Sequence, residues 1–136
     1  MKKVVESEGE MRKFGEEFAK GLELPAVVEL RGDVGAGKTT FTRGLAKGLG
    51  VEETVVSPSF TISKRYRFPG GELVHYDFYR LEEPGIMAEE LAETLEEKDA
   101  VVVVELAGEV EGLLPEKRNV VKITTLTEER REISVE

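Results

Sequence analysis

Apolar residues recur at intervals of three and four in two segments of the chain, and this spacing predicts two amphipathic helices. The first is expected over residues 7–22, where Ser7 and Glu10 fit the capping box of a helix N-terminus. The second is expected to begin at Lys38 and to end at Gly50, because glycine commonly terminates helices. The two apolar stripes consist of Met11, Phe14, Phe18 and Leu22, and of Phe41, Leu45 and Leu49.

Runs of apolar and β-branched residues predict strands. Residues 101–104 are four consecutive valines, which is typical of a strand buried on both faces of a sheet. Another strand, at residues 26–30, runs into a glycine-rich segment. The other expected elements are a hairpin of strands at 59–68 and 72–79 around Pro69 and Gly70, an acidic surface helix at 87–98, and late strands at 120–126 and 131–135 that form a second hairpin.

This mixture of helices and strands predicts an α/β fold. Strands that alternate with helices favour a three-layer αβα arrangement, with a mixed central sheet that carries antiparallel hairpins. The length of 136 residues suits a single domain over residues 1–136.

Charge and composition narrow the classes of function. The chain has 28 acidic and 19 basic residues, a formal net charge of −9, so we expect that it does not hold a nucleic acid alone. It has no cysteine, which excludes disulfides and thiolate metal sites. Residues 1–5 lack the apolar region of a signal peptide, and no apolar run approaches the roughly 18 residues of a membrane span. We therefore expect a cytoplasmic protein.

The segment RGDVGAGKTTF, residues 31–41, fits the phosphate-binding pattern G-x-x-x-x-G-K-[ST]. Glycines let the backbone curl so that successive N–H groups converge on a phosphate, and the N-terminus of the following helix adds further donors. Lys38 is placed to reach the β- and γ-phosphates, and the Thr39 hydroxyl to ligate Mg²⁺. A chance glycine-rich turn is the alternative. The strand before the motif and the helix after it favour nucleotide binding.

Glu105 directly follows the four valines and is a candidate metal ligand. Phosphate-loop enzymes usually hold Mg²⁺ with an acid at the end of a second strand. Ligands also collect at the carboxyl ends of the parallel strands of an α/β sheet. The alternative is a glutamate that emerges into solvent where the strand stops.

The segment HYDFYR, residues 75–80, holds a second candidate acid. Alternation along a strand separates a polar set, His75, Asp77 and Tyr79, from an apolar set, Tyr76 and Phe78. Asp77 could orient an attacking water or hold a metal-bound water, or it could be a structural carboxylate paired with Arg80 or a hydroxyl. We interpret His75 as a half-buried hydrogen-bonded residue rather than a proton donor.

The segment SPSFT, residues 57–61, lies between the second helix and the first hairpin. Pro58 fixes an extended turn and leaves the hydroxyls of Ser59 and Thr61 available. A segment at this place often senses the γ-phosphate in nucleotide hydrolases, whereas a plain turn is the simpler interpretation.

Four segments in this order carry a specific resemblance: GDVGAGKTTFTRGLAKGLG, VVSPSFTISKRY, HYDFYRL and VVVVEL. Together they closely resemble the TsaE (YjeE) family, bacterial ATPases of tRNA threonylcarbamoyladenosine synthesis, over essentially the whole chain. The resemblance implies a P-loop NTPase fold, with Lys38, Asp77 and Glu105 in the active site and Mg²⁺ on Thr39 and Glu105. It places ATP on Gly35, Ala36, Gly37, Lys38, Thr39 and Thr40, and the adenine near Ser7, Glu8 and Arg130.

The same resemblance implies TsaD and TsaB as protein partners, with tRNA reached only through their complex. One departure concerns Leu106, which stands where the family usually has Trp, so no aromatic stacking is expected there. We assign no role to Glu109, because residues 107–109 follow the family pattern less closely.

Two other functions compete with a partner-dependent ATPase. A small-molecule or nucleoside kinase could use the same loop, but such enzymes usually carry a basic lid, and residues 81–98 are acidic. A nucleotide-gated binding module without useful hydrolysis would differ from the ATPase only in rate.

Overall fold

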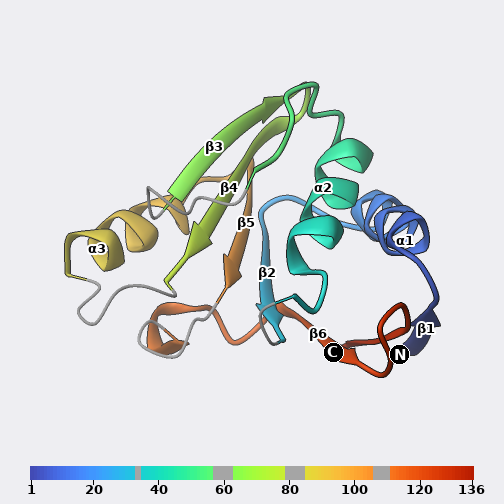
Figure 1. The fold of residues 1–136 in the computed structure, drawn as a ribbon. Coiled ribbons are helices and arrows are strands. Elements are labelled where there is room, and N and C mark those ends of the chain that lie inside the picture. The colour runs from blue at the N-terminus through green and yellow to red at the C-terminus, as the bar shows by residue number, and fades with distance from the viewer. Residues whose placement is uncertain (33–34, 57–62, 79–84, 106–110) are drawn as a thin grey trace.

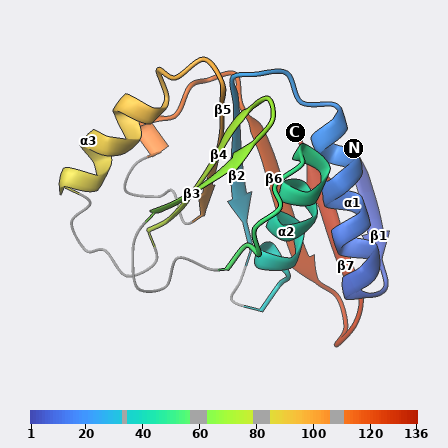
Figure 2. The ribbon, with the colours of Figure 1, turned by 90° about the horizontal axis from the view of Figure 1, so that it is seen from above.

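A mixed sheet forms the centre of the computed structural model, which describes residues 1–32, 35–56, 63–78, 85–105 and 111–136. Within these residues seven strands lie in the order β1-β7-β6-β2-β5-β4-β3, and all seven are labelled in Figure 2, which turns the view of Figure 1 by 90°. The strands are Lys2–Val5 (β1), Ala26–Arg31 (β2), Ser63–Phe68 (β3), Gly71–Asp77 (β4), Ala100–Glu105 (β5), Asn119–Thr125 (β6) and Arg131–Val135 (β7). The helices are Glu8–Lys20 (α1), Lys38–Leu49 (α2) and Gly85–Thr94 (α3), with a short 3-10 helix (η2) at Glu111–Leu113.

Parallel strands occupy the middle of the sheet and antiparallel strands its edges. Strand β2 pairs in parallel with β5 and β6, and β5 pairs in parallel with β4. Strand β3 is antiparallel to β4 at one edge, while β7 is antiparallel to both β6 and β1 at the other. The four parallel strands therefore end at one common edge of the sheet, where an α/β fold collects its ligands.

Helices cover both faces of the sheet, as the three-layer prediction required. Helices α1 and α2 lie together on one face and α3 lies on the other (Figures 1 and 2). The valines of β5 alternate between two cores: Val101 and Val103 belong to the core under α1 and α2, and Val102 and Val104 to the core with α3. All six residues of β5 are buried, which confirms a strand buried on both faces.

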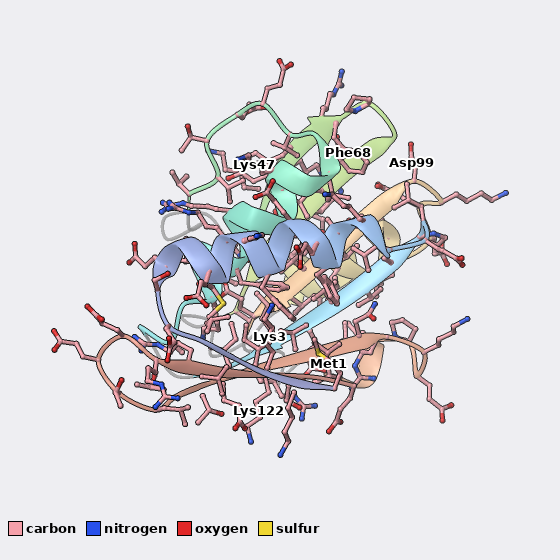
Figure 3. The ribbon with its side chains drawn as sticks, turned by 90° about the vertical axis from the view of Figure 1, so that its right-hand side faces the viewer. Met1, Lys3, Lys47, Phe68, Asp99 and Lys122 are labelled. Atoms are coloured by element: carbon pink, nitrogen blue, oxygen red, sulfur yellow. The ribbon has the colours of Figure 1, made fainter. Side chains whose placement is uncertain are left out.

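The edge at β1, β7 and β6 has a different environment on each face. Lys3 points toward α1, with its ammonium 5.8 Å from the centroid of the Phe14 ring, whereas Lys122 points away from α1 (Figure 3). Lys122 and Thr124 of β6 are exposed, so polar residues occupy the face that carries α3 at this edge of the sheet, where α3 does not reach.

Most element boundaries match those expected from the sequence. Ser7 caps α1, because its hydroxyl accepts a hydrogen bond from the Glu10 N–H at 3.1 Å, and Gly50 ends α2 with a φ of 98°. One expectation was wrong, because α3 spans residues 85–94 rather than 87–98. Strand β1 was missed, because no strand was expected at residues 2–5.

Helices α1 and α2 cross with their backbones in contact, because three glycines face the crossing. A Cβ on Gly15 would lie 2.5 Å from the Phe41 carbonyl oxygen, and one on Gly48 would lie 2.6 Å from that of Glu16. A Cβ on Gly44 would collide with the carbonyl group of Arg12. This close approach fixes α2, and with it the loop that precedes it, against the rest of the molecule.

Substituting Gly44 with alanine is expected to destabilise the fold by about 3 kcal/mol, since two backbones would have to separate to admit the methyl group. Urea denaturation of the nucleotide-free protein measures this loss. Gly9→Ala is the matched control: Gly9 lies in α1, the other helix of the pair, but its Cβ would meet only the Ser7 hydroxyl, at 3.7 Å. That variant should be as stable as the parent or slightly more stable. Equal stability of Gly44→Ala and the parent would contradict the close crossing.

Candidate functional site

The glycine-rich segment, defined here as Gly32 and Gly35–Gly37 among the described residues, connects β2 to α2. Gly35 and Gly37 have φ values of 83° and 106°, a conformation that side-chain-bearing residues rarely adopt. At Gly32 a Cβ would lie 2.7 Å from the Ile123 carbonyl oxygen of β6. Glycine is thus required at these positions by backbone shape or by close approach. The segment ends at Gly37, directly before the first turn of α2.

Lys38 spans this segment. It is the first residue of α2, and its ammonium donates a hydrogen bond to the Gly32 carbonyl at 2.7 Å. The residue is buried, with 8% of its surface exposed, which is uncommon for a lysine. Its carbonyl accepts a hydrogen bond from the Thr42 hydroxyl at 2.9 Å. The charged group is therefore held at the start of α2, inside the curl of the glycine-rich segment.

Glu105 is buried rather than emerging into solvent, so the simpler of its two interpretations is wrong. Its side chain is 5% exposed and lies 2.6 Å from Nε2 of His75, measured to the carboxylate Oε2. His75 is fully buried, which corrects the expectation of a half-buried residue and confirms that it is hydrogen-bonded. Its Nδ1 has no hydrogen-bond partner among the described residues. An Nε2–H donor would hold the Glu105 carboxylate in one orientation.

Asp77 lies beside Glu105 at the carboxyl edge of the sheet. The two residues are register partners in the parallel pair β4–β5, and Leu30 of β2 is the partner of Glu105 on its other side. The Phe78 N–H donates to the Glu105 carbonyl at 3.3 Å. Both predicted acids thus end neighbouring strands of the same parallel set as β2, from which the glycine-rich segment continues.

The apolar set of HYDFYR lies on the opposite face, as alternation predicted. Tyr76 and Phe78 stack with their ring centroids 5.9 Å apart in the core with α3. The Tyr76 hydroxyl lies 2.7 Å from that of Thr94. Burial raises the pKa of Tyr76 to about 12. Tyr76 therefore stays neutral at physiological pH, as a residue that fixes α3 to the sheet.

Ser7 and Arg130, assigned to the adenine from the resemblance, lie at the start of α1 and in the β6–β7 connection, next to elements that approach the glycine-rich segment. The Arg130 guanidinium is 3.4 Å from the Glu6 carboxylate, next to Ser7 and Glu8. Both Ser7 and Glu8 are exposed. Met11 of α1 approaches the segment itself, since a Cβ on Gly37 would lie 3.2 Å from its methyl group. The start of α1 and the β6–β7 connection thus border the same site.

Arg131 also contacts the glycine-rich segment, and the sequence reasoning did not single it out. Its guanidinium donates from Nε to the Ala36 carbonyl at 3.2 Å and from Nη2 to the Gly35 carbonyl at 3.4 Å. Strand alternation could have located it, because Arg131 shares a strand face with the buried Ile133. A cation at such a position implies a buried or loop-bound partner.

Arg31, the cation immediately before the segment, is bound structurally. It and Arg118 both donate to the buried Glu29 carboxylate, Arg118 at 2.9 Å. Burial raises the pKa of Glu29, but the hydrogen bonds from Arg31 and Arg118 outweigh it and keep that pKa below the usual range. Sequence reasoning gave no role to Glu29 or Arg118.

Several predicted positions lie outside the described residues: Ser57 to Thr61, Tyr79, Arg80, Leu106 and Glu109. Thr39 and Thr40 are described and half-buried in the first turn of α2, and Gly35 is exposed. Among the described residues no group of three or more His, Asp or Glu side chains could form a metal cage. A Mg²⁺ site that used a single carboxylate and a single hydroxyl would not require such a cage, because Mg²⁺ commonly takes its other ligands from water and phosphate.

These observations define the class of protein to which the chain belongs. The chain is a mixed α/β protein with a glycine-rich loop, a buried lysine and two strand-end acids at the carboxyl edge of its parallel strands. The family model described as threonylcarbamoyl adenosine biosynthesis protein TsaE matches residues 5–133. The chain belongs to the TsaE family, which takes part in tRNA threonylcarbamoyladenosine biosynthesis. This confirms the resemblance found in the sequence.

Individual relatives support the same family. The protein named tRNA threonylcarbamoyladenosine biosynthesis protein TsaE from Haemophilus influenzae is 35% identical over 124 residues, 88% of this chain and 78% of that protein. Its namesake from Treponema pallidum is 34% identical over 137 residues and covers 99% of both chains. The crystal structure of Bacillus subtilis YdiB superposes with a TM-score of 0.83 at 32% identity, over 99% of this chain and 83% of that one.

None of the described helices is both long and apolar enough to cross a membrane.

Proposed function

We propose that this chain has the P-loop NTPase fold and is a cytoplasmic, Mg²⁺-dependent ATPase. It would support threonylcarbamoylation of the tRNA adenosine next to the anticodon, acting with TsaD and TsaB. The observation that carries the proposal is the buried Lys38, which spans a loop whose glycines adopt left-handed conformations. A buried ammonium bonded to a main-chain carbonyl is poised to exchange that partner for a phosphate oxygen, a stronger acceptor.

The phosphates would bind on residues 35–40. The N–H groups of the glycine-rich segment and of the first turn of α2 carry positive potential, and anions bind at such helix N-termini. Lys38 would contribute its charge at the β- and γ-phosphates. Gly35 is exposed, and a Cβ placed on it would meet no described atom within 4 Å, so this side of the loop has room for a ligand.

Mg²⁺ fits the donor set that Thr39 and Glu105 offer, an oxygen from a hydroxyl and one from a carboxylate, with phosphate and water oxygens completing the shell. When bound, the ion would neutralise charge on the β- and γ-phosphate oxygens. The contribution of the chain is orientation: the hydrogen bond from His75 fixes the Glu105 carboxylate, and second-sphere partners of this kind tune metal ligands.

Asp77 would position the attacking water. It ends the strand beside Glu105, the proposed metal ligand, so it would lie on the γ-phosphate side of the site rather than the base side. Ser7, Glu8 and Arg130, at the opposite corner, would border the adenine. The protein partners would supply the surface for tRNA, since this chain carries a net charge of −9.

Two substitutions separate the roles of the acids. Glu105→Gln is expected to weaken Mg²⁺-dependent ATP binding about tenfold or more, because the charge that faces the metal is lost while a side-chain oxygen still accepts from His75. Asp77→Asn should bind ATP nearly normally and hydrolyse it about a hundredfold more slowly. Titration calorimetry with and without Mg²⁺, together with phosphate release, measures both effects.

Glu116→Gln serves as the control, since Glu116 is an exposed acid in the connection before β6. It should bind and hydrolyse ATP as the parent does. An equal loss of binding in Glu105→Gln and Asp77→Asn would show that their roles have been divided wrongly. A parent protein that does not bind ATP at all would contradict the proposed function itself.

A further inference from the structure

Arg131 connects the β6–β7 hairpin to the glycine-rich segment through one guanidinium group. Its inner edge donates to the carbonyls of Ala36 and Gly35. Its Nη1 donates to the carbonyls of Thr127 at 2.7 Å, Glu128 at 3.0 Å and Arg130 at 3.0 Å. Within the described residues these acceptors are all main-chain carbonyls, and no carboxylate pairs with the group.

The two inner hydrogen bonds fix the direction of two peptide planes. A trans peptide unit is planar, and its C=O and N–H groups point in opposite directions. The Gly35 carbonyl belongs to the same plane as the Ala36 N–H, and the Ala36 carbonyl to the same plane as the Gly37 N–H. When Arg131 holds both carbonyls on its own side of the loop, it turns these two N–H groups toward the other side.

We propose that Arg131 is a positioning residue that keeps the glycine-rich segment in its phosphate-binding shape. This inference rests on the proposed function, because the N–H groups it orients are those assigned to the phosphates. Glycine residues leave the segment with high conformational freedom, so without a brace the anion nest would lose conformational entropy when the ligand binds, and the affinity would be lower. A guanidinium can brace it because its donors form a rigid planar fork that reaches several acceptors at once.

The same contacts join two parts of the site. The carbonyls on the outer edge of the guanidinium belong to the connection that carries Arg130, which lies beside Glu6 at the start of α1. Arg131 would thus hold the base side and the phosphate side in one arrangement. A lysine would keep the charge but could not span both edges.

The inference is tested by comparing the parent with Arg131→Met, which retains the apolar stem, and Arg131→Lys. In the nucleotide-free protein, hydrogen exchange of the amides in residues 35–38 should become about tenfold faster in Arg131→Met, because the loop loses its brace. Affinity for MgADP, measured by titration calorimetry, should fall about tenfold or more, in proportion to the charge-assisted hydrogen bonds lost. Arg131→Lys should give an intermediate loss in both measurements.

Arg65→Met is the matched control. Arg65 makes comparable hydrogen bonds to Glu72, Glu97 and Thr94, but it lies in β3 at the opposite edge of the sheet. It should lower thermal stability while loop exchange and MgADP affinity stay at the parent values. If Arg131→Met behaves in the same way, Arg131 is merely structural and the inference is overturned.

The inference can still be tested if Arg131→Met does not fold or if the parent does not bind MgADP. If Arg131→Met does not fold, Arg131→Lys carries the test, and parental exchange and affinity in that variant would overturn the inference. If the parent does not bind MgADP, the proposed function fails, whereas faster loop exchange in Arg131→Met would still support Arg131 as the brace of the loop.

Discussion

Lys38→Ala is expected to lower ATP hydrolysis by about a hundredfold or more while the nucleotide-free protein remains folded. The substitution removes the charge assigned to the β- and γ-phosphates. It also removes the hydrogen bond from the ammonium to the Gly32 carbonyl, which contributes about 1.5–3 kcal/mol, but the cost of burying the ammonium is removed as well, so the net loss of stability is about 1 kcal/mol. The melting temperature should therefore move by only a few degrees, roughly what 1 kcal/mol produces in a domain of this size.

Lys47→Ala is the control for this experiment. Lys47 lies on the same helix, but its side chain is 75% exposed and its ammonium is 3.8 Å from the Glu16 carboxylate. Exposed ion pairs contribute little to stability, so hydrolysis and melting temperature should both stay near the parent values. Phosphate release and thermal unfolding on the three proteins give the comparison. Turnover at the parent rate in Lys38→Ala would contradict the assignment of the glycine-rich segment to phosphate binding.

The central part of the fold could be predicted because its signals are local. Four valines predict a strand buried on both faces, and Ser7 and Gly50 mark helix ends by side-chain capping and by left-handed backbone. Strand β1 gives no such signal. It has four residues and only Val5 is buried, so its place is decided by pairing with β7 at the other end of the chain. Non-local pairing of this kind leaves little trace in a short window of sequence.

The candidate site likewise has features that the local sequence predicts and contacts that depend on distant positions. The glycine spacing and the strand-end acids could be found in the sequence because motif and strand end are contiguous in the chain. The brace from Arg131 to Ala36 joins positions 95 residues apart, and the Glu29–Arg118 pair joins positions 89 apart. Their chemistry becomes visible only when β6 and β7 are placed beside β2. The His75–Glu105 contact likewise required the parallel register of β4 and β5.

The supply of positive charge at the phosphates suggests how hydrolysis is controlled. Fast hydrolysis requires a held Mg²⁺, a positioned water and positive charge that meets the charge developing on the γ-phosphate. Among the described residues around the loop, Arg31 is bound to Glu29 and Arg131 to main-chain carbonyls, while Lys38 is already assigned to ground-state binding. The described part of the chain therefore meets the third requirement only weakly, and an arginine supplied by a partner would meet it.

We accordingly expect slow ATP turnover by the isolated chain and a large rise when TsaD and TsaB are added together. An arginine supplied in trans increases hydrolysis roughly a thousandfold or more in other nucleotide hydrolases, and ordering of residues 57–61 at an interface would act in the same direction. The effect is measured as phosphate release at saturating MgATP. The reaction is run with each partner alone, with both partners, and with an unrelated protein at equal concentration. Adding both partners to Lys38→Ala shows whether the released phosphate comes from this site. A full-speed isolated enzyme that the partners leave unchanged, but that a small-molecule acceptor accelerates, would favour a kinase instead.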